Sequence, residues 1–421
     1  MRQVIKPLSC LTVALAVAGC AGTEGGEESE AELVERARAI HERVITIDTH
    51  DDIPSNFATD EVDPLNADRQ VTLEKMRAGG LDVAFFVVYV GQTERTPENY
   101  EQAKADAMTK FDAIHRLAEE MYPDQIEVAH SADDVERIHA SGKLVAAIGI
   151  ENGYAIGKDL SLLQKYYELG GRYITLAHNG HNDISDSATP RPDLGDAEAE
   201  HGGLSEFGER VVAEMNRLGI IVDVSHISKD ASLHAMRVSR APVIASHSSS
   251  RALADVPRNL DDDQLLALKE NGGVMQTVAL GSFLKVQPAE YDEAVRAIRE
   301  EMDISGGFGG VMRLDPERRT EYDRRVGELD ERWPPANLQD YVNHIDYAVD
   351  LIGIDHVGIS SDFDGGGGIE GWRDASESLN VTIELVRRGY AEGDIRKLWG
   401  GNTLRVWREV ERVATEMQEE G

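Results

Sequence analysis

The chain has 421 residues, of which 41% are hydrophobic, so it can bury a large core. Its 77 Asp and Glu residues outnumber its 43 Lys and Arg residues, which gives a formal net charge of −34 and a surface that repels nucleic acid. The two cysteines are Cys10 and Cys20, so the rest of the chain has no disulfide and no thiolate ligand, and any metal site there must use His and carboxylates.

The first residues have the pattern of a bacterial lipoprotein signal peptide. Two basic residues precede an apolar stretch, residues 8–18, that is too short to span a bilayer as a finished helix. The stretch runs into Val-Ala-Gly-Cys at residues 17–20, which resembles a lipobox. We therefore expect residues 1–19 to be removed and Cys20 to carry lipid. The alternative is an ordinary secretory signal with a chance cysteine.

The residues after the expected cleavage point indicate where the protein would be held. Residues 20–31 are rich in Gly and Glu without apolar periodicity, which predicts a flexible acidic tether. Ala21 rather than Asp follows Cys20, which in a Gram-negative cell favours the outer membrane over the inner one. We expect a lipid-anchored protein that faces the periplasm.

The remaining chain alternates apolar runs with helical patterns. An amphipathic helix is expected to begin near Ala31. Runs rich in Val and Ile predict eight strands, at residues 44–50, 81–90, 144–151, 173–178, 220–226, 242–247, 273–279 and 356–362. Helical patterns separate most of them, as at residues 162–169, 207–218, 231–238 and 338–352.

This alternation indicates the fold class. Continuous apolar strands alternating with helices are typical of a parallel sheet covered on both faces. Eight such units predict an α/β fold of the (β/α)8 TIM barrel type. A doubly wound open sheet is the alternative, which we consider weaker because an open sheet seldom collects ligands from so many strands at one point.

One segment interrupts the alternation. Residues 281–337 are charged, with a glycine-rich run at 306–310. They follow the seventh predicted strand, on the side of a barrel where active sites lie. They could form a lid or an oligomer contact, or a solvated excursion without a role. We expect residues 32–421 to form a single domain that contains this insertion.

Six of the predicted strands stop at, or next to, a residue that can bind a metal or move a proton. These residues are His50, Glu151, His178, His226, His247 and Asp362. The C-terminal ends of parallel strands lie together, so side chains that are far apart in the sequence should converge on one small volume.

Five residues have the chemistry of a metal site. His50 and Asp52 are two residues apart, so in a strand both face the same side. Glu151 follows seven small or apolar residues, where a carboxylate is costly unless it is paired or metal-bound. His226 and His247 end successive strands. Three His and two carboxylates suit zinc, and one bridging carboxylate suits a pair of ions about 3.5 Å apart, as used in hydrolysis.

Other residues could act on a substrate. His178 could polarise a carbonyl or stabilise an oxyanion, although a hydrogen-bonded loop residue is an equal alternative. Asp362 could take a proton from water and pass it to a leaving amine, with Asp364 as a competitor that we interpret as a turn residue. Arg258 could hold a substrate carboxylate, with a surface role as the alternative.

Several segments together resemble the membrane dipeptidase (renal dipeptidase) family of zinc peptidases. They are DTHDDIP, GIENG, LAHN, DVSH, VIASHSSSRAL, VPRNL and DHVGISSDFDGG, in family order from residue 48 to 366, followed by GNTLRVW near the end. The resemblance implies a barrel of the amidohydrolase type that binds two zinc ions. It implies that His50 and Asp52 bind one ion, that Glu151 bridges, and that His226 and His247 bind the other.

The resemblance also implies a reaction. A metal-bridging hydroxide would cleave dipeptides, L,L and probably L,D, and members of the family are often homodimers. His178 would contact the substrate and the tetrahedral intermediate, Arg258 would hold the terminal carboxylate, and Asp362 would shuttle the proton. The chain departs from the well-studied mammalian members at residues 275–278, where they have an Asn and aromatic residues, which bears on side-chain specificity.

Two other functions are compatible with parts of the pattern. Another binuclear amidohydrolase, acting on a lactone, a cyclic amide or a phosphotriester, could use the same five ligands. A surface lipoprotein that binds without catalysis could keep a degenerate site. The presence of Arg258 and the intact ligand set favour the dipeptidase over both.

Overall fold

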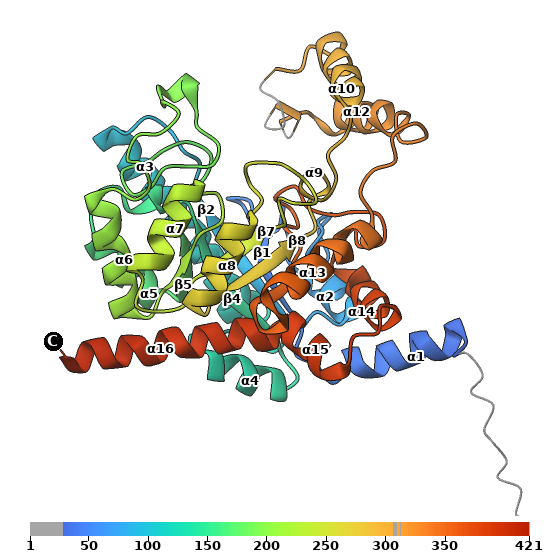
Figure 1. Ribbon diagram of the computed structural model, residues 1–421, viewed down its shortest axis with the longest axis horizontal. Coiled ribbons are helices and arrows are strands. Elements are labelled where there is room, and N and C mark those ends of the chain that lie inside the picture. Colours follow the sequence, from blue (N-terminus) through green and yellow to red (C-terminus); the bar gives the residue numbers. More distant parts are fainter. Residues whose placement is uncertain (1–27, 306–309, 312, 421) are drawn as a thin grey trace, which may run out of the picture.

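The computed structural model describes residues 28–305, 310–311 and 313–420, and a barrel of eight parallel strands lies at its centre (Figure 1). The strands are β1 (Ile47–Asp52), β2 (Val83–Tyr89), β4 (Leu144–Glu151), β5 (Gly171–Thr175), β6 (Ile221–Asp223), β7 (Ile244–Ser248), β8 (Val274–Val278) and β9 (Val357–Ser360). Each pairs with the next in this order. The backbone N–H of Asp52 donates to the carbonyl of Phe363 at 2.9 Å, which joins the two ends of the sheet. The barrel is confirmed over the open sheet.

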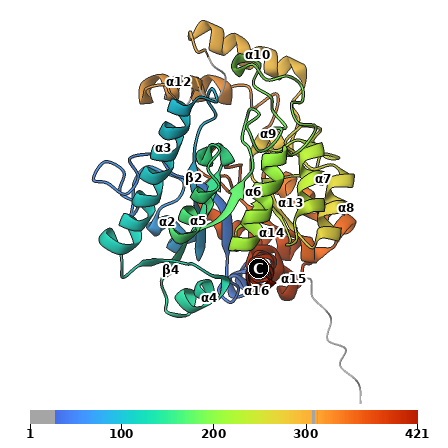
Figure 2. The same ribbon diagram turned by 90° about the vertical axis from the view of Figure 1, so that its left-hand side faces the viewer.

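Helices surround the barrel (Figures 1 and 2). Those before the insertion are α1 (Glu30–His41), α2 (Leu73–Gly79), α3 (Pro97–His115), α4 (Ala132–Ala140), α5 (Ser161–Glu168), α6 (Glu206–Leu218), α7 (Lys229–Val238) and α8 (Asp262–Asn271). Those after it are α13 (Leu338–Ile352), α14 (Ser378–Arg387), α15 (Glu392–Arg396) and α16 (Asn402–Glu420). Most start on a Ser, Thr, Asp or Asn side chain that accepts from a backbone N–H of the first turn, as Thr96 does for α3.

The C-terminal helix α16 closes one end of the barrel. Trp407 and Val410 of this helix share one apolar cluster with barrel residues such as Phe85 and Tyr173. Figure 1 shows α16 running beneath the strands, on the side away from the insertion. Because packed side chains fill this end, open space in the barrel lies at the other end, where the strands finish.

All eight predicted strands exist, but three finish two or three residues earlier than expected. His178, His226 and Asp362 lie in the loops that follow β5, β6 and β9. His226 and Asp362 have φ values of 67° and 61°, and a residue in this left-handed conformation cannot continue a strand. The prediction that each strand ends on these residues was therefore wrong. A short strand, β3 (Ile126–Val128), which pairs with β4 outside the barrel, was not predicted.

The insertion stands above the open end of the barrel (Figure 1). It contains α9 (Gly281–Leu284), α10 (Ala289–Glu301) and α12 (Pro316–Gly327). Ile298, Val311 and Tyr322 form a small apolar cluster separate from the barrel core.

The expected signal peptide and Cys20 lie outside the described residues. Among the residues that are described, no helix combines the length and the apolar character needed to cross a membrane.

A glycine in β4 makes room for the buried ring of Tyr173. A Cβ atom at Gly149 would overlap Cζ and the hydroxyl oxygen of this tyrosine. We expect Gly149→Ala to lower the free energy of unfolding by about 1–3 kcal/mol, measured by urea denaturation, because an overpacked core forces its neighbours to shift. Gly393→Ala is the control, since that glycine is exposed in α15 with open space around it, and it should change stability by less than about 1 kcal/mol. Equal losses in both variants would contradict this account of Gly149.

Candidate metal centre

The predicted site residues lie together at the open end of the barrel. A cavity of about 700 Å³ is lined by Asp52, Glu151, His178, His226, His247, Arg258 and Asp362. His50 is fully buried, and its Nε2 lies 3.6 Å from Oε2 of Glu151, one of the residues that line the cavity. The structure therefore brings together all the predicted metal and substrate residues.

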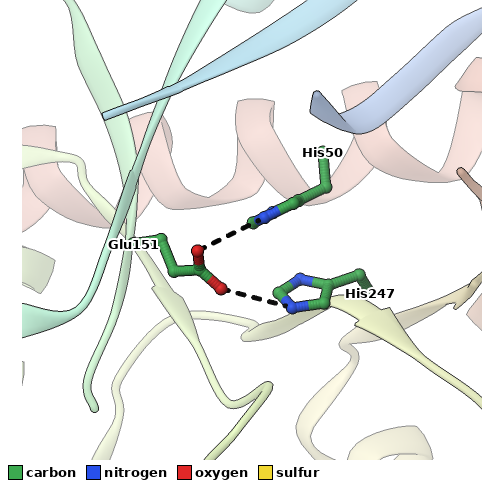
Figure 3. Close-up of side chains that lie close together, drawn as sticks. All are labelled: His50, Glu151 and His247. Atoms are coloured by element: carbon green, nitrogen blue, oxygen red, sulfur yellow. Dashed lines mark ion pairs between the residues drawn. The ribbon is translucent and has the colours of Figure 1, made fainter. Parts of the chain in front are cut away.

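Glu151 lies at the centre of the group. Its carboxylate is nearly buried, at 3% exposure, and its two oxygens face different partners. Oε2 lies 3.6 Å from Nε2 of His50, and Oε1 lies 3.4 Å from Nε2 of His247 (Figure 3). Oε1 also lies 3.0 Å from Nε2 of His226. A carboxylate in this position can bridge two cations.

The remaining donors complete three overlapping groups whose ligand atoms lie within 4.8 Å of one another. These groups are His50, Glu151 and His247; Glu151, His178 and His226; and His50, Asp52 and Asp362. Imidazole and carboxylate donors suit zinc and similar divalent ions. The chemistry of the donor set therefore fits a metal site.

Hydrogen bonds to Tyr173 set the tautomer of His50. The Tyr173 hydroxyl donates its one hydrogen to the carbonyl of Thr49 at 3.0 Å, so it can only accept from Nδ1 of His50, which lies 2.9 Å away. In the neutral imidazole this places the proton on Nδ1 and the lone pair on Nε2. Among the described residues, this buried Nε2 has no hydrogen-bond partner, which is costly unless a cation binds it.

Asp223 sets the tautomer of His247 through the hydroxyl of Ser246. The Ser246 hydroxyl donates to Oδ2 of Asp223 at 2.7 Å, so it accepts from Nδ1 of His247, 2.8 Å away. Nε2 of His247 then keeps its lone pair, and it lies 2.8 Å from Nε2 of His226 and 3.4 Å from Oε1 of Glu151. The Asp223 carboxylate also accepts from the Thr175 hydroxyl at 2.5 Å, which fixes its position across β5, β6 and β7.

The electrostatics of the group favour the binding of positive charge. Burial raises the pKa of Glu151, but the neighbouring His178 and His50 outweigh burial and hold the pKa well below its usual range. Burial lowers the pKa of His50, but the carboxylates, Glu151 foremost, outweigh burial and raise it to about 9, so Nε2 holds a proton near pH 7 that a bound cation would displace. Burial and adjacent positive groups hold the pKa of His226 and of His247 well below the usual value. These two imidazoles are neutral near pH 7, as metal ligands must be.

Burial also shifts the pKa of His178 and of Asp362. Burial lowers the pKa of His178, and although Glu151 opposes this, Arg258 reinforces it, so the pKa is about 4. Its imidazole is therefore neutral near pH 7 and can donate one hydrogen bond. Burial raises the pKa of Asp362 well above its ordinary value, and Asp52 adds to this. A carboxyl group with a raised pKa can accept a proton and release it again near neutral pH.

Arg258 is a buried cation on the cavity wall. Its side chain is only 7% exposed, and among the described residues it makes no ion pair. One terminal nitrogen donates to the carbonyl of His247 at 3.2 Å, and the guanidinium lies over the ring of Phe283, 5.3 Å from its centre. A buried guanidinium without a carboxylate partner is arranged to receive one from a ligand.

Asp364, the alternative to Asp362, has a structural role. Its carboxylate accepts from the backbone N–H groups of Gln70 and Val71 at 3.1 and 3.2 Å, and it pairs with Arg69 at 3.1 Å. It has a φ value of 62° and joins two loops, as expected for a turn residue.

Four residues of the centre were missed by sequence reasoning. Tyr173 and Asp223 orient ligands, and both are polar groups inside apolar strand patterns, which was a usable signal. Tyr89 ends β2, lines the cavity and packs edge-on to His178, with ring centres 4.8 Å apart. Lys110 of α3 lies nearly buried over the Tyr89 ring, 5.3 Å from its centre, and has no such signal in the sequence.

Comparisons with known proteins agree with this geometry. The family model for membrane dipeptidase, peptidase family M19, matches residues 34–421. The dipeptidase aclJ of Aspergillus oryzae is 36% identical over 352 residues, which cover 82% of this chain and 71% of that protein. The dipeptidase verJ of Clonostachys rogersoniana is 31% identical over 393 residues, covering 89% and 86%.

A solved structure gives the same result. The probable dipeptidase PvdM of Pseudomonas aeruginosa is 35% identical, with a TM-score of 0.80, and the match covers 91% of this chain and all of that one. The resemblance seen in the sequence is confirmed. The chain belongs to the membrane dipeptidase family and is a metallodipeptidase.

Proposed function

We propose that the chain is a binuclear zinc dipeptidase that hydrolyses L,L and L,D dipeptides. The observation that carries the proposal is the placement of Glu151, whose two carboxylate oxygens face different histidines within 3.6 Å. One buried carboxylate between two sets of imidazoles suits a pair of ions better than a single ion.

The ligands divide into two sets around this carboxylate. His50 and Asp52, from β1, would hold one ion, and His226 and His247, which follow β6 and lie in β7, would hold the other. Glu151 would bind both. When bound, the ions supply Lewis acidity that polarises a peptide carbonyl and acidifies water.

The position of Arg258 supports the proposal that the substrate has a free carboxylate close to the scissile bond. Its guanidinium contacts the backbone of the ligand His247, so a carboxylate bound to it lies within one residue of the metal centre. A longer peptide would place its carboxylate farther away. The position of Arg258 therefore selects dipeptides over longer peptides. It also argues against lactones and phosphotriesters, which have no such carboxylate.

Two further residues would move protons and hold the reacting carbonyl. Asp362 lies in one ligand group with His50 and Asp52, where it can take the proton of the attacking water and deliver it to the leaving amine. His178 is neutral and lines the cavity beside Glu151, so it can donate to the oxygen on which negative charge develops.

The direct test is turnover by the purified zinc-loaded protein. We expect hydrolysis of a panel of L,L and L,D dipeptides, and a value of kcat/KM at least about tenfold lower for C-terminal amides, because hydrogen bonds to charged groups contribute about 1.5–3 kcal/mol. Glu151→Gln should lose zinc, measured by mass spectrometry of metals, together with activity. Absence of turnover across the panel would contradict the proposal, as would full activity in the Gln variant.

A second prediction concerns the residue that orients a ligand. Tyr173→Phe removes the acceptor of the Nδ1 hydrogen of His50, so zinc affinity, measured by competition with a chelator, should fall about 10- to 100-fold. Tyr341→Phe is the matched control, because that buried hydroxyl donates to the carbonyl of Thr277 at 3.0 Å and does not line the cavity. If both variants bound zinc equally well, Tyr173 would have no part in setting the tautomer.

We propose in addition that the mature protein is lipid-anchored at Cys20 and faces the periplasm from the outer membrane, which the residue at position 21 favours. Metabolic labelling with a fatty acid should mark the wild type and spare Cys20→Ala. Cys10→Ala changes the other cysteine of the chain and should keep the label. Equal labelling of the wild type and Cys20→Ala would refute the anchor. A homodimer, which the family resemblance implies, stays a prediction.

A further inference from the structure

The insertion supplies one wall of the substrate cavity. Ser282 and Phe283 line the cavity from α9, at the start of the insertion, and Arg299 lines it from helix α10. Figures 1 and 2 show α10 and α12 standing over the open end of the barrel. A ligand in the cavity therefore meets a segment that takes no part in the barrel or in metal binding.

This wall, rather than residues 275–278, faces the substrate. Those four residues depart from the mammalian pattern, but they lie in β8, are buried and do not line the cavity. Gln276, for example, donates to the hydroxyl of Thr403 at 2.7 Å, and Thr403 belongs to α16, the helix at the closed end of the barrel. Side-chain preference must therefore come from other residues of the cavity.

Arg299 is held in place by the second helix of the insertion. Its Nε donates to the hydroxyl of Tyr322 on α12 at 3.3 Å, and its guanidinium lies 6.0 Å from the centre of that ring. Tyr322 is itself 7% exposed, in the apolar cluster with Ile298 and Val311. A side chain positioned in this way loses little conformational freedom when it binds a ligand.

The positive charge of Arg299 is available to a ligand. Two arginines of α12 are neutralised, since Arg324 pairs with Glu321 at 2.8 Å and Arg325 pairs with Glu301. Among the described residues, Arg299 makes no ion pair. In a chain with a formal net charge of −34, a free guanidinium on a cavity wall provides local attraction for an anion that the rest of the surface repels.

The wall lies beside the end of the substrate that Arg258 would hold. Phe283, from the insertion, packs under the Arg258 guanidinium at 5.3 Å. The residue whose carboxylate binds Arg258 therefore rests against the insertion. The cavity of about 700 Å³ lies within the range of about 300–1,000 Å³ seen for drug-sized ligands, so a dipeptide with an extended side chain fits.

The acidic residues of the cavity do not cancel this attraction. Asp52 and Glu151 belong to the metal centre, and Asp364 pairs with Arg69 at 3.1 Å. Asp362 is the remaining carboxylate of the lining, and it lies in one ligand group with His50 and Asp52.

We propose that Arg299 is a specificity-determining residue that binds an acidic side chain on the C-terminal residue of the dipeptide. The planar guanidinium would pair with the side-chain carboxylate while Arg258 holds the terminal one. The preferred substrates are then dipeptides that end in an acidic residue. The inference rests on the proposed dipeptidase function and deepens it.

A pair of isosteric substrates tests the inference. The wild type should hydrolyse L-Ala-L-Glu with a kcat/KM about tenfold or more above that for L-Ala-L-Gln, and Arg299→Gln should bring this ratio close to one. Arg296→Gln is the matched control, because Arg296 is exposed on the same helix and does not line the cavity, and it should keep the wild-type ratio. Tyr322→Phe should lower the ratio less than Arg299→Gln does, because this variant loses the hydrogen bond that positions Arg299 but retains the charge.

A binding measurement separates recognition from turnover. Calorimetric titration of Asp362→Asn should show that L-Ala-L-Glu binds with a Kd about tenfold or more below that of L-Ala-L-Gln. The double variant with Arg299→Gln should bind the two dipeptides with similar Kd values. Equal kcat/KM values in the wild type, an unchanged ratio in Arg299→Gln, or an equal loss in Tyr322→Phe would overturn the role of Arg299 while the dipeptidase function stands. Failure to hydrolyse any dipeptide would remove that function, and the titration would still decide whether Arg299 binds the acidic side chain.

Discussion

The structure depends on the burial of one carboxylate. Glu151 finishes a strand of apolar residues and is almost removed from water, where an uncompensated charge is very costly. Histidines from β1, β7 and the loops after β5 and β6 surround it, and they lower its pKa. Apolar residues of similar size would pack here at less cost, so the arrangement is explained by what it binds and not by stability.

The barrel supplies the geometry that this carboxylate needs. Parallel strands deliver side chains from distant parts of the sequence to one end, and α16 fills the other end with Trp407 and its neighbours. Backbone turns with positive φ at His226 and Asp362 direct two of these residues back over the cavity. A second layer, formed by Tyr173 and Asp223, leaves a lone pair on the histidine nitrogens that face Glu151.

Chemistry and substrate choice are carried by different parts of the chain. The barrel holds the ligands and the proposed proton shuttle, whereas the insertion contributes Phe283 and Arg299 to the cavity wall. Changes in the insertion can therefore alter which dipeptide is accepted without disturbing the metal centre. This separation follows from the fold, because residues after a barrel strand reach the site without being part of the sheet.

The sequence by itself determined the fold class and the candidate ligand set, because both are encoded locally. Apolar runs alternate with helical patterns, and residues such as His50 and Glu151 interrupt or end those runs. The tertiary structure alone decided the exact strand ends, the orienting role of Tyr173 and the entry of Arg299 into the cavity. Each of these depends on contacts between segments that are remote in the sequence, as between Tyr173 and His50, and local patterns do not record such contacts.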